Sequence, residues 1–237
     1  MVLLTTGDTR EAVFLERPNR FLCRASLEET GNIVLAHVAD PGRLTELLCP
    51  GNRILLCRAL RGAARKTSHS LVAARRGREW VLVNTTFHRA IADAVLRDPA
   101  LSPFGAAEEI RAEVRAEGTS SRLDFLLRTG DGRETWLEVK GCTLAEGTTA
   151  LFPDAPTARG RKHLSELAGL VRSGRTAALL FLVFPAGVEC IRANRATDPG
   201  FADALRIAVD TGVAVRAVKL GFDGTRVTHR GDLPVCV

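Results

Sequence analysis

The sequence predicts a protein of two domains, a small β-barrel followed by an α/β or α+β sandwich with a mixed sheet. Residues 1–84 contain short apolar and β-branched runs separated at regular intervals by turn-forming residues, a pattern typical of barrels. From residue 85 onward, helical and strand patterns alternate, which is typical of a sandwich of helices on a sheet. We therefore expect domains at 1–84 and 85–237.

The first domain is expected to contain six strands and one short helical segment. Pro and Gly turn signals separate the strands, and Asp40-Pro41-Gly42 precedes the helical segment at Arg43–Leu48. A helix start beside Arg43 suits an anion site, although a plain connection with Arg43 in solvent explains the residues equally well. The expected strands are Ala12–Glu16, Phe21–Leu27, Ile33–Ala39, Arg53–Arg61, Ser70–Arg75 and Glu79–Asn84.

The second domain is expected to alternate helices and strands. Thr157 is a good N-cap for the helix that follows the long loop 141–160. The stretch Phe104–Glu113 reads as a helix, or as a helix that runs into a strand. The other expected helices are Phe87–Arg97, Arg159–Val171 and Gly200–Thr211, and the expected strands are Arg122–Arg128, Glu134–Lys140, Ala177–Phe184 and Val213–Leu220.

The composition is that of a soluble globular protein. The chain has 237 residues, of which 46% are hydrophobic and 25% are charged, enough for a substantial core. No apolar run approaches the roughly 20 residues of a membrane span, and the first residues lack a secretion-signal pattern. The six cysteines form no CxxC pair and have no zinc spacing. We expect a cytoplasmic protein with reduced thiols and no contact with a membrane.

The net charge of +6 favours a polyanionic partner such as nucleic acid. An Arg-rich composition without functional meaning explains the same charge, since only four of the 33 basic residues are Lys. The charge alone does not separate these two interpretations.

The most informative local pattern is a hairpin that carries two carboxylates. The loop 129–133 suits a hairpin turn, and the register it implies places Asp124 directly opposite Glu138, with Cβ atoms about 5 Å apart. Like charges at this distance repel, and a divalent cation such as Mg²⁺ or Mn²⁺ would offset the repulsion. Lys140 lies on the same face. Alternatively, this is an ordinary polar face on which Arg122 and Lys140 balance the acids.

The helix after the long loop carries a second group of polar residues. Arg159, Lys162, His163 and Glu166 follow helical spacing and predict one continuous polar face. A basic face near a carboxylate site would hold phosphates, whereas a solvated helix face needs no ligand.

Four stretches together resemble a known family. They are "HVADPGRLTELL", "SRLDF", "LEVKG" and "LFPDAPTARGRKHLSEL", in this order and spacing. The chain is similar over most of its length to the sugar fermentation stimulation protein A (SfsA) family, which is described as DNA-binding. The resemblance implies an N-terminal OB-like barrel and a C-terminal domain like the PD-(D/E)XK nucleases.

The resemblance also implies site residues. Asp124 matches the first metal-binding acid, Glu138 and Lys140 match the ExK pair, and Glu113 matches an acid that joins such sites from a preceding helix. Arg122, Arg159 and His163 match basic positions around the site, and with Lys162 and Arg43 they are the residues expected to contact nucleic acid. Two positions depart from the family pattern: Leu123 stands where such motifs have Pro, and His88 where an Asn is expected, although Asn84 is retained.

Two functions follow as hypotheses. The first is a DNA-binding protein with an Mg²⁺- or Mn²⁺-dependent phosphodiesterase site. DNA is favoured over RNA as the partner, and the sequence does not indicate which nucleic acid is cleaved or whether it is single- or double-stranded. The second is a non-catalytic DNA-binding regulator of sugar-utilisation genes. A small-molecule enzyme has support only from the anion site at Arg43. The sequence does not indicate the oligomeric state.

Overall fold

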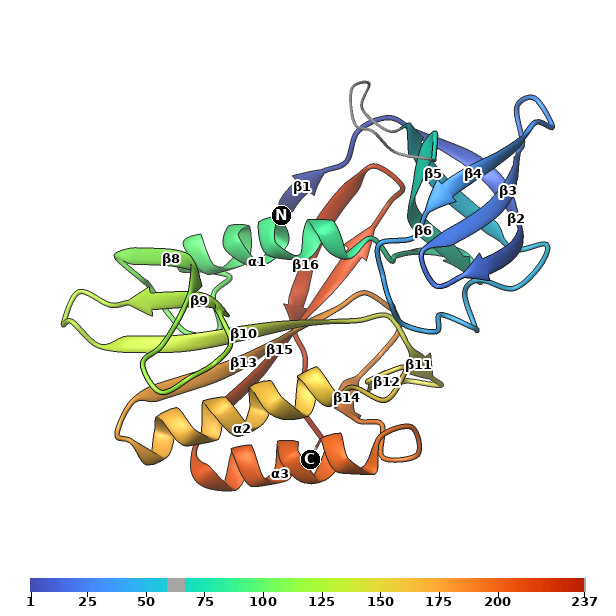
Figure 1. Cartoon of the computed structure of the whole chain (residues 1–237). Coiled ribbons are helices and arrows are strands. Elements are labelled where there is room, and N and C mark those ends of the chain that lie inside the picture. Colours follow the sequence, from blue (N-terminus) through green and yellow to red (C-terminus); the bar gives the residue numbers. More distant parts are fainter. Residues whose placement is uncertain (59–66, 237) are drawn as a thin grey trace.

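The computed structural model describes residues 1–58 and 67–236, and it contains a barrel attached to one end of a layered α/β unit (Figure 1). The barrel sheet has the order β4-β3-β2-β5-β6-β7, and a parallel pairing of β4 with β6 closes it. Its strands are β2 (Thr9–Asn19), β3 (Leu22–Leu27), β4 (Ile33–His37), β5 (Arg53–Arg58), β6 (His69–Arg76) and β7 (Glu79–Leu82).

The second unit is built on a seven-stranded mixed sheet of order β1-β16-β15-β13-β10-β9-β8. The central strands β10, β13 and β15 are parallel and the outer pairings are antiparallel. Its strands are β1 (Val2–Thr5), β8 (Glu109–Val114), β9 (Leu123–Arg128), β10 (Glu134–Cys142), β13 (Thr176–Val183), β15 (Ala214–Phe222) and β16 (Arg226–Asp232). A small sheet beside it contains β11 (Ala145–Glu146), β12 (Thr149–Phe152) and β14 (Cys190–Ala193).

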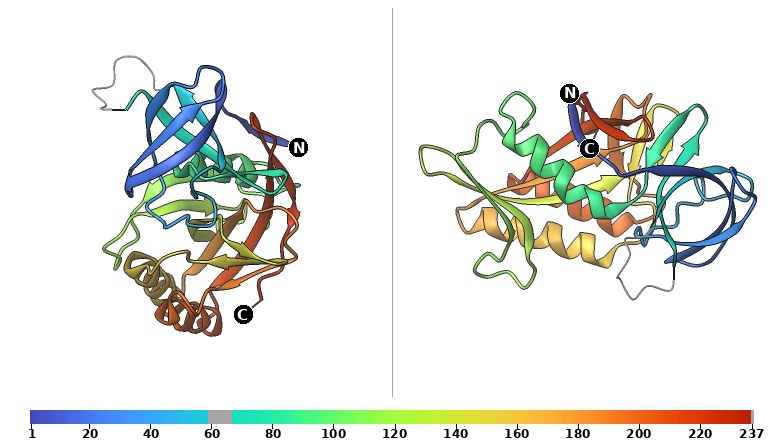
Figure 2. Two further views of the ribbon diagram at one scale, coloured as in Figure 1. Left: turned by 90° about the vertical axis from the view of Figure 1, so that its right-hand side faces the viewer. Right: turned by 90° about the horizontal axis from the view of Figure 1, so that it is seen from above.

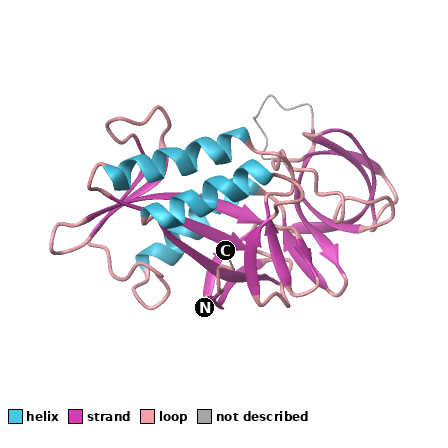
Figure 3. Ribbon diagram, turned by 90° about the horizontal axis from the view of Figure 1, so that it is seen from below, coloured by secondary structure: helices cyan, strands magenta, loops and turns pink. Residues whose placement is uncertain are grey.

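Helices cover both faces of the large sheet. The 3₁₀ turn η1 (Thr85–Phe87) leads into α1 (His88–Arg97) on one face, while α2 (Ala158–Arg172) and α3 (Pro199–Thr211) run side by side across the other (Figure 3). Both of these helices begin at a capping side chain. Thr157 Oγ1 accepts a hydrogen bond from the backbone N–H of Gly160 (3.0 Å), which confirms the predicted N-cap, and Asp198 accepts one from Phe201 (2.9 Å).

The burial pattern of β13 shows why the sheet needs helices on both sides. Every residue from 177 to 183 is buried, and alternate side chains enter different cores. Ala178, Leu180 and Leu182 face α1, whereas Leu179 and Phe181 face α2 and α3. The long apolar run in the sequence is therefore a central parallel strand.

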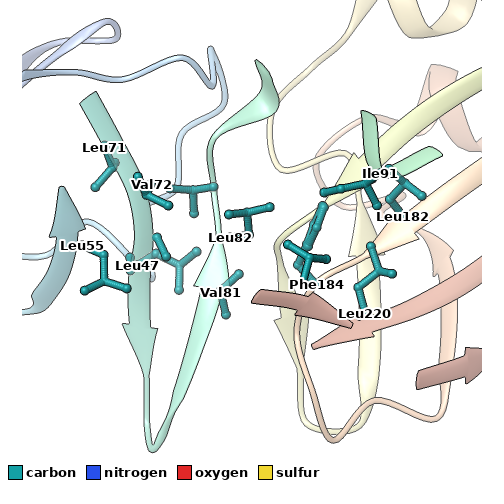
Figure 4. Packing of buried hydrophobic residues seen from close by; sticks show 14 of the residues in the cluster. Leu47, Leu55, Leu71, Val72, Val81, Leu82, Ile91, Leu182, Phe184 and Leu220 are labelled. Carbon is teal, nitrogen blue, oxygen red and sulfur yellow. The ribbon is translucent and has the colours of Figure 1, made fainter. Parts of the chain in front are cut away.

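The core on the α1 side continues into the barrel without a break (Figure 4). Leu71 and Leu82 of the barrel belong to the same buried cluster as Ile91, Leu182 and Leu220 of the second unit. The N-terminal strand adds a second connection, since β1 pairs with β16 before the chain enters the barrel (Figure 2). This corrects the expectation that residues 1–84 form only the barrel.

Two predicted helical segments are different in the structure. The stretch Phe104–Glu113 contains no helix and ends in β8, whose apolar residues at 110, 112 and 114 alternate as in a strand. The segment Arg43–Leu48 forms a single turn, because Leu44 has a positive φ of 51° and only Leu47 and Leu48 bond back to its carbonyl. The helix start that favoured an anion site at Arg43 is therefore absent from this described segment.

The remaining predictions of secondary structure agree with the structure to within a few residues, and β1, β11, β12, β14 and β16 were not expected. Residues 59–61, the end of the predicted strand Arg53–Arg61, lie outside the described residues. Within the described part of the chain, no helix has the length and hydropathy that crossing a membrane requires.

His88, where the family resemblance leads us to expect Asn, is half-buried between the two units and lines a cavity there. Its ring stacks on Phe184 with centroids 5.1 Å apart, and an added Cβ at Gly141 would collide with it. Nε2 of His88 is buried without a hydrogen-bond partner. Burial lowers the pKa of His88 from 6.5 to about 4, so the ring is neutral near pH 7.

We expect His88→Phe to remove an acid sensitivity of folding. Between pH 6.5 and 4 the unfolded wild-type chain binds a proton at His88 that the folded chain excludes, so wild-type stability falls as the pH falls. The variant should gain up to roughly 3 kcal/mol on the wild type across this interval. Urea unfolding of both proteins at pH 7.0 and 4.5 measures the difference, and parallel pH curves would contradict the assignment.

Candidate active site

Asp124 and Glu138 line a cavity of about 650 Å³ between the barrel and the second unit, whereas Glu113 is not among its lining residues. The barrel contributes Arg20 and the loop at Asp40, and the large sheet contributes Asp124, Glu138 and Lys140. A cleft between two domains is a common place for a ligand site.

Three neighbouring strands bring three acids into one row. The ladder pairs on either side of Glu113 in β8 place it opposite Asp124 in β9. The β9–β10 ladder, continued one residue beyond the pair Phe125–Leu137, places Asp124 opposite Glu138. This is the hairpin register that the sequence predicts. Glu113 comes from an edge strand, however, and not from a preceding helix.

Glu138 is the most buried of the three acids, with 2% of the residue exposed. Its Oε1 contacts both Lys140 Nζ and His163 Nδ1, while Oε2 is buried without a hydrogen-bond partner. Burial raises the pKa of Glu138, but the hydrogen bond from His163 and the charge of Lys140 outweigh burial, so the pKa lies below its ordinary value. The carboxylate is therefore ionised near neutral pH.

The tautomer of His163 follows from its contacts. Arg159 Nε donates to Nε2 of His163 (3.3 Å), so Nε2 is the nitrogen without a proton. Nδ1 then carries the proton and donates to Glu138. The chain Arg159–His163–Glu138 connects α2 to the middle of β10.

Asp124 is half-buried and is oriented by the backbone. Its Oδ2 accepts a hydrogen bond from the N–H of Val139 (2.7 Å). Burial, followed by the negative charge of Glu138, raises the pKa of Asp124 to about 6. The expected repulsion between the two carboxylates is thus present in the structure.

Glu113 is the outermost of the three acids. Its side chain is 50% exposed and forms an ion pair of 3.6 Å with Arg89 of α1, and its backbone has a positive φ of 56°. An uncommon backbone conformation in a β-strand is often associated with a functional position.

The donor set suits a hard divalent cation held by two carboxylates. Among the described residues, no three Asp, Glu, His or Cys side chains are close enough to form a metal cluster by themselves. Mg²⁺ is commonly bound by one or two carboxylates together with waters and substrate phosphates. The unpartnered Oε2 of Glu138, beside Asp124, supplies the start of such a site.

The basic residues expected around the site do not form one surface. Arg159 is exposed and lines the cavity, whereas Arg43, Arg122 and Lys162 are exposed and lie outside its wall. His163 is only 2% exposed and points at Glu138, which corrects the prediction of a continuous polar face on this helix. Helical spacing identifies the polar residues of α2. It does not show that His163, one of these residues, contacts the buried carboxylate of Glu138.

Sequence reasoning missed a second acid pair in the cavity wall, formed by Asp40 and Asp154. Asp154 Oδ2 accepts from the backbone N–H of Leu44 (3.2 Å), across the domain junction. Burial, together with the charges of Asp154 and Glu46, raises the pKa of Asp40 to about 6. Both acids lie within the stretches that carry the family resemblance, and this is the sequence feature that could have identified them as site residues.

Arg17 of β2 holds the loop that carries Asp40 in the cavity. Its guanidinium donates to four backbone carbonyls, those of Arg20, Asp40, Gly42 and Arg43 (2.6–3.0 Å). A close approach of Asp154 also requires Gly42, because an added Cβ there would lie 2.3 Å from Oδ2 of Asp154.

Comparisons with known proteins identify the family. Family models match residues 15–83 as an SfsA N-terminal OB domain and residues 82–226 as a sugar fermentation stimulation protein RE domain. Sugar fermentation stimulation protein homologues of Methanococcoides burtonii and Methanothermobacter thermautotrophicus are 41% and 42% identical over 95% and 94% of this chain, and over 92% and 90% of their own lengths. The chain therefore belongs to the sugar fermentation stimulation protein family, and its barrel is an OB domain.

A solved structure is similar over the whole chain. The structure of Pyrococcus furiosus SfsA in complex with Ca²⁺ covers 100% of both chains, with a TM-score of 0.89 and 28% sequence identity. The arrangement of the barrel and the large sheet described above is thus shared with a relative.

We expect His163→Ala to destabilise the fold and Lys162→Ala to leave it unchanged. Removing His163 leaves the buried Glu138 carboxylate without one of its two partners, which typically costs about 1–3 kcal/mol. Lys162 is exposed on the same helix, and its removal should change stability by less than about 0.5 kcal/mol. Urea unfolding of the two variants measures this contrast. Equal effects would show that His163 does not stabilise Glu138.

Proposed function

We propose that this member of the family binds DNA and cleaves it in a divalent-metal-dependent reaction at Asp124 and Glu138, with a second domain of the PD-(D/E)XK nuclease type. The observation that supports this most strongly is the unpartnered buried oxygen of Glu138, beside Asp124 and Lys140 in an accessible cavity. Two acids that repel each other are costly to keep together unless a cation binds between them.

Mg²⁺ or Mn²⁺ is the proposed cofactor. Asp124 and Glu138 would hold it, and Glu113, opposite Asp124 in the sheet, would complete or support the site. When bound, such an ion polarises a phosphate oxygen and lowers the pKa of a water molecule. The Ca²⁺ in the Pyrococcus furiosus relative supports a site for a hard divalent cation in the family.

The chain's own residues would position the substrate and its charges. Lys140 projects from β10 beside Glu138, and its ammonium group would orient a water molecule or stabilise negative charge on the phosphate. Arg159 is exposed at the cavity wall, where its guanidinium would bind a phosphate while its Nε supports His163. His163 is a positioning residue that fixes the carboxylate of Glu138.

Affinity for DNA would come mainly from contacts with phosphates. The chain has a net charge of +6, which favours contacts with phosphates. Only 5% of its residues are aromatic and none is Tyr, so few side chains are available to stack on a series of bases. Exposed Arg122, Lys162 and Arg43 remain candidates for such contacts.

A non-catalytic DNA-binding regulator is the second candidate, and one set of observations favours it. Lys140 already balances the charge of Glu138, the neutral His163 donates a hydrogen bond to it, and Arg89 pairs with Glu113. The chain's own side chains thus offset the repulsion between the acids. In that case the site would be structural and the paired acids would have no role in cleavage.

We expect the wild type to cleave labelled DNA in the presence of Mg²⁺ or Mn²⁺ and to lose this activity in EDTA. Glu138→Gln keeps the shape of the side chain but removes its charge, and Lys140→Gln removes the ammonium group. Each should slow cleavage by about 10²-fold or more. Gel analysis of products from single-stranded and double-stranded DNA and from RNA measures the rate and the preferred substrate.

The matched control is Arg206→Gln, which removes an exposed cation of α3 that does not line the cavity. It should retain the wild-type rate at saturating substrate. Intact DNA with the wild type under both metals, with binding retained, would contradict the nuclease and favour the regulator.

A further inference from the structure

A second groove lies at the junction of the two domains, on the other side of the His88–Phe184 stack. It has a volume of about 580 Å³, within the size range of ligand sites, and shares none of its lining residues with the carboxylate cavity. His88 lines the cavity and Phe184 lines the groove, so their stacked rings form part of the wall between them. The hairpin β6–β7 forms one side and the hairpin β15–β16 the other.

Four cations converge on this groove without carboxylate partners. None of them forms a salt bridge with any described residue. Many arginines elsewhere on the surface, in contrast, pair with a carboxylate. Lys219 Nζ donates only to the carbonyl of Val188 (3.3 Å). The four cations are Arg75, Arg78, Lys219 and Arg230.

The two acids of the groove do not neutralise these cations. Asp223 accepts hydrogen bonds from the backbone N–H groups of Thr225 and Arg226 and pairs with the Arg226 side chain, which fixes it in its own turn. Glu79 is exposed and makes no ion pair with a described residue. The groove therefore carries a net positive charge.

The carboxylate cavity has no such excess. Four acids and four bases line it, so its formal charge is balanced without a metal. They are Asp40, Asp124, Glu138 and Asp154, and Arg20, Arg89, Lys140 and Arg159. Beyond the local contacts proposed for Lys140, Arg159 and the metal ion, a polyanion gains little net attraction from the side chains of the cavity, so other surfaces would contribute to its binding energy.

Trp80 gives the groove a flat aromatic wall. The Arg75 guanidinium lies 4.6 Å from the centre of the Trp80 ring, a cation–π contact that also presents a planar, positively charged surface. The indole N–H has no acceptor among the described residues. An Arg plane beside an aromatic ring can stack a nucleobase, and free guanidinium groups bind phosphates in a bidentate manner.

Gly221 and Gly224 of the β15–β16 hairpin lie next to Arg230 and Trp80. A Cβ at Gly221 would lie 2.7 Å from Nε of Arg230, and a Cβ at Gly224 would lie 3.7 Å from the indole ring of Trp80. Gly224 also has a positive φ of 104°, which disfavours other residues. The backbone of the β15–β16 hairpin thus lies close to both Arg230 and Trp80.

We propose that this groove, formed by Arg75, Arg78, Trp80, Lys219 and Arg230, is a second DNA-binding site that holds a single-stranded segment through its phosphates and one stacked base. The proposal rests on the proposed DNA-binding function and adds a binding surface outside the cavity. Single-stranded DNA fits better than a duplex, because a base must leave its stack to lie against Trp80.

The experiment measures the affinity for a fluorescein-labelled 20-nucleotide single strand in EDTA, which prevents metal-dependent cleavage, over a range of salt concentrations. The test variant is Arg78→Gln/Arg230→Gln in the full chain. The control variant Arg206→Gln/Arg216→Gln removes the same charge from exposed residues that line neither the groove nor the cavity. Circular dichroism and thermal unfolding check that both variants are folded.

The test variant should bind about tenfold more weakly, and its slope of log affinity against log salt should be shallower by about 1.4, since two contacts to phosphates of a single strand are lost. The control should keep the wild-type slope. The strand should also quench the fluorescence of Trp80, and Trp80→Phe should lose this quenching while it retains the fold.

If the wild type binds strongly and the test variant keeps the same affinity and slope, the groove is not a DNA-binding site, and the proposed function is unaffected. An equal loss in the control would also overturn it, because only overall charge would then matter. Equally tight binding of dAMP would assign the groove to a free nucleotide instead of a strand. Failure of the wild type to bind DNA at all would overturn the proposed function and the groove together.

Discussion

The buried carboxylate of Glu138 is the constraint on which the site and the packing of α2 both depend. An ionised group at 2% exposure is unstable unless donors surround it. Lys140 reaches it from the same face of β10, two residues along, and His163 reaches it from α2. The position of α2 on the sheet is therefore set by a polar contact as well as by its apolar stripe. The same contacts fix one oxygen of Glu138 and leave the other free.

The position of the cavity follows from a hydrophobic core that the two domains share. Barrel residues such as Leu71 and Leu82 and sheet residues such as Leu182 belong to one buried cluster, so the domains are packed against each other without a ligand (Figure 4). Arg17 then fixes the loop at Asp40 against this junction by bonding to backbone carbonyls. Preorganisation of this kind reduces the ordering that a bound substrate would otherwise require.

The sequence predicts local features well and long-range contacts poorly. The hairpin register, α1, α2 and β13 follow from turn chemistry and periodicity, which act over a few residues. The pairing of β1 with β16 joins residues more than 200 positions apart, and no local pattern indicates it. For Phe104–Glu113 the sequence leaves open a helix or a helix that runs into a strand, and the alternation of residues 110, 112 and 114 agrees with a strand at its end. His163 is buried against Glu138, which lies 25 residues away in the sequence. Helical spacing alone therefore predicts, wrongly, that His163 lies on an exposed polar face.

The groove carries cations unpaired within the described residues, whereas the charges of the carboxylate cavity are balanced. The two proposed roles, binding of a DNA strand and its cleavage, would therefore respond differently to salt. The cations of the groove are free of ion pairs with described residues, so their attraction for a polyanion acts through water and is screened by salt. The contact between Glu138 and Lys140 is largely buried and is screened much less. Raising the ionic strength would then weaken the capture of a strand while the electrostatics at the carboxylates stay nearly constant. With the proposed DNA site in the groove, salt would change the affinity for DNA on one surface without changing the charge balance of the site where cleavage is proposed.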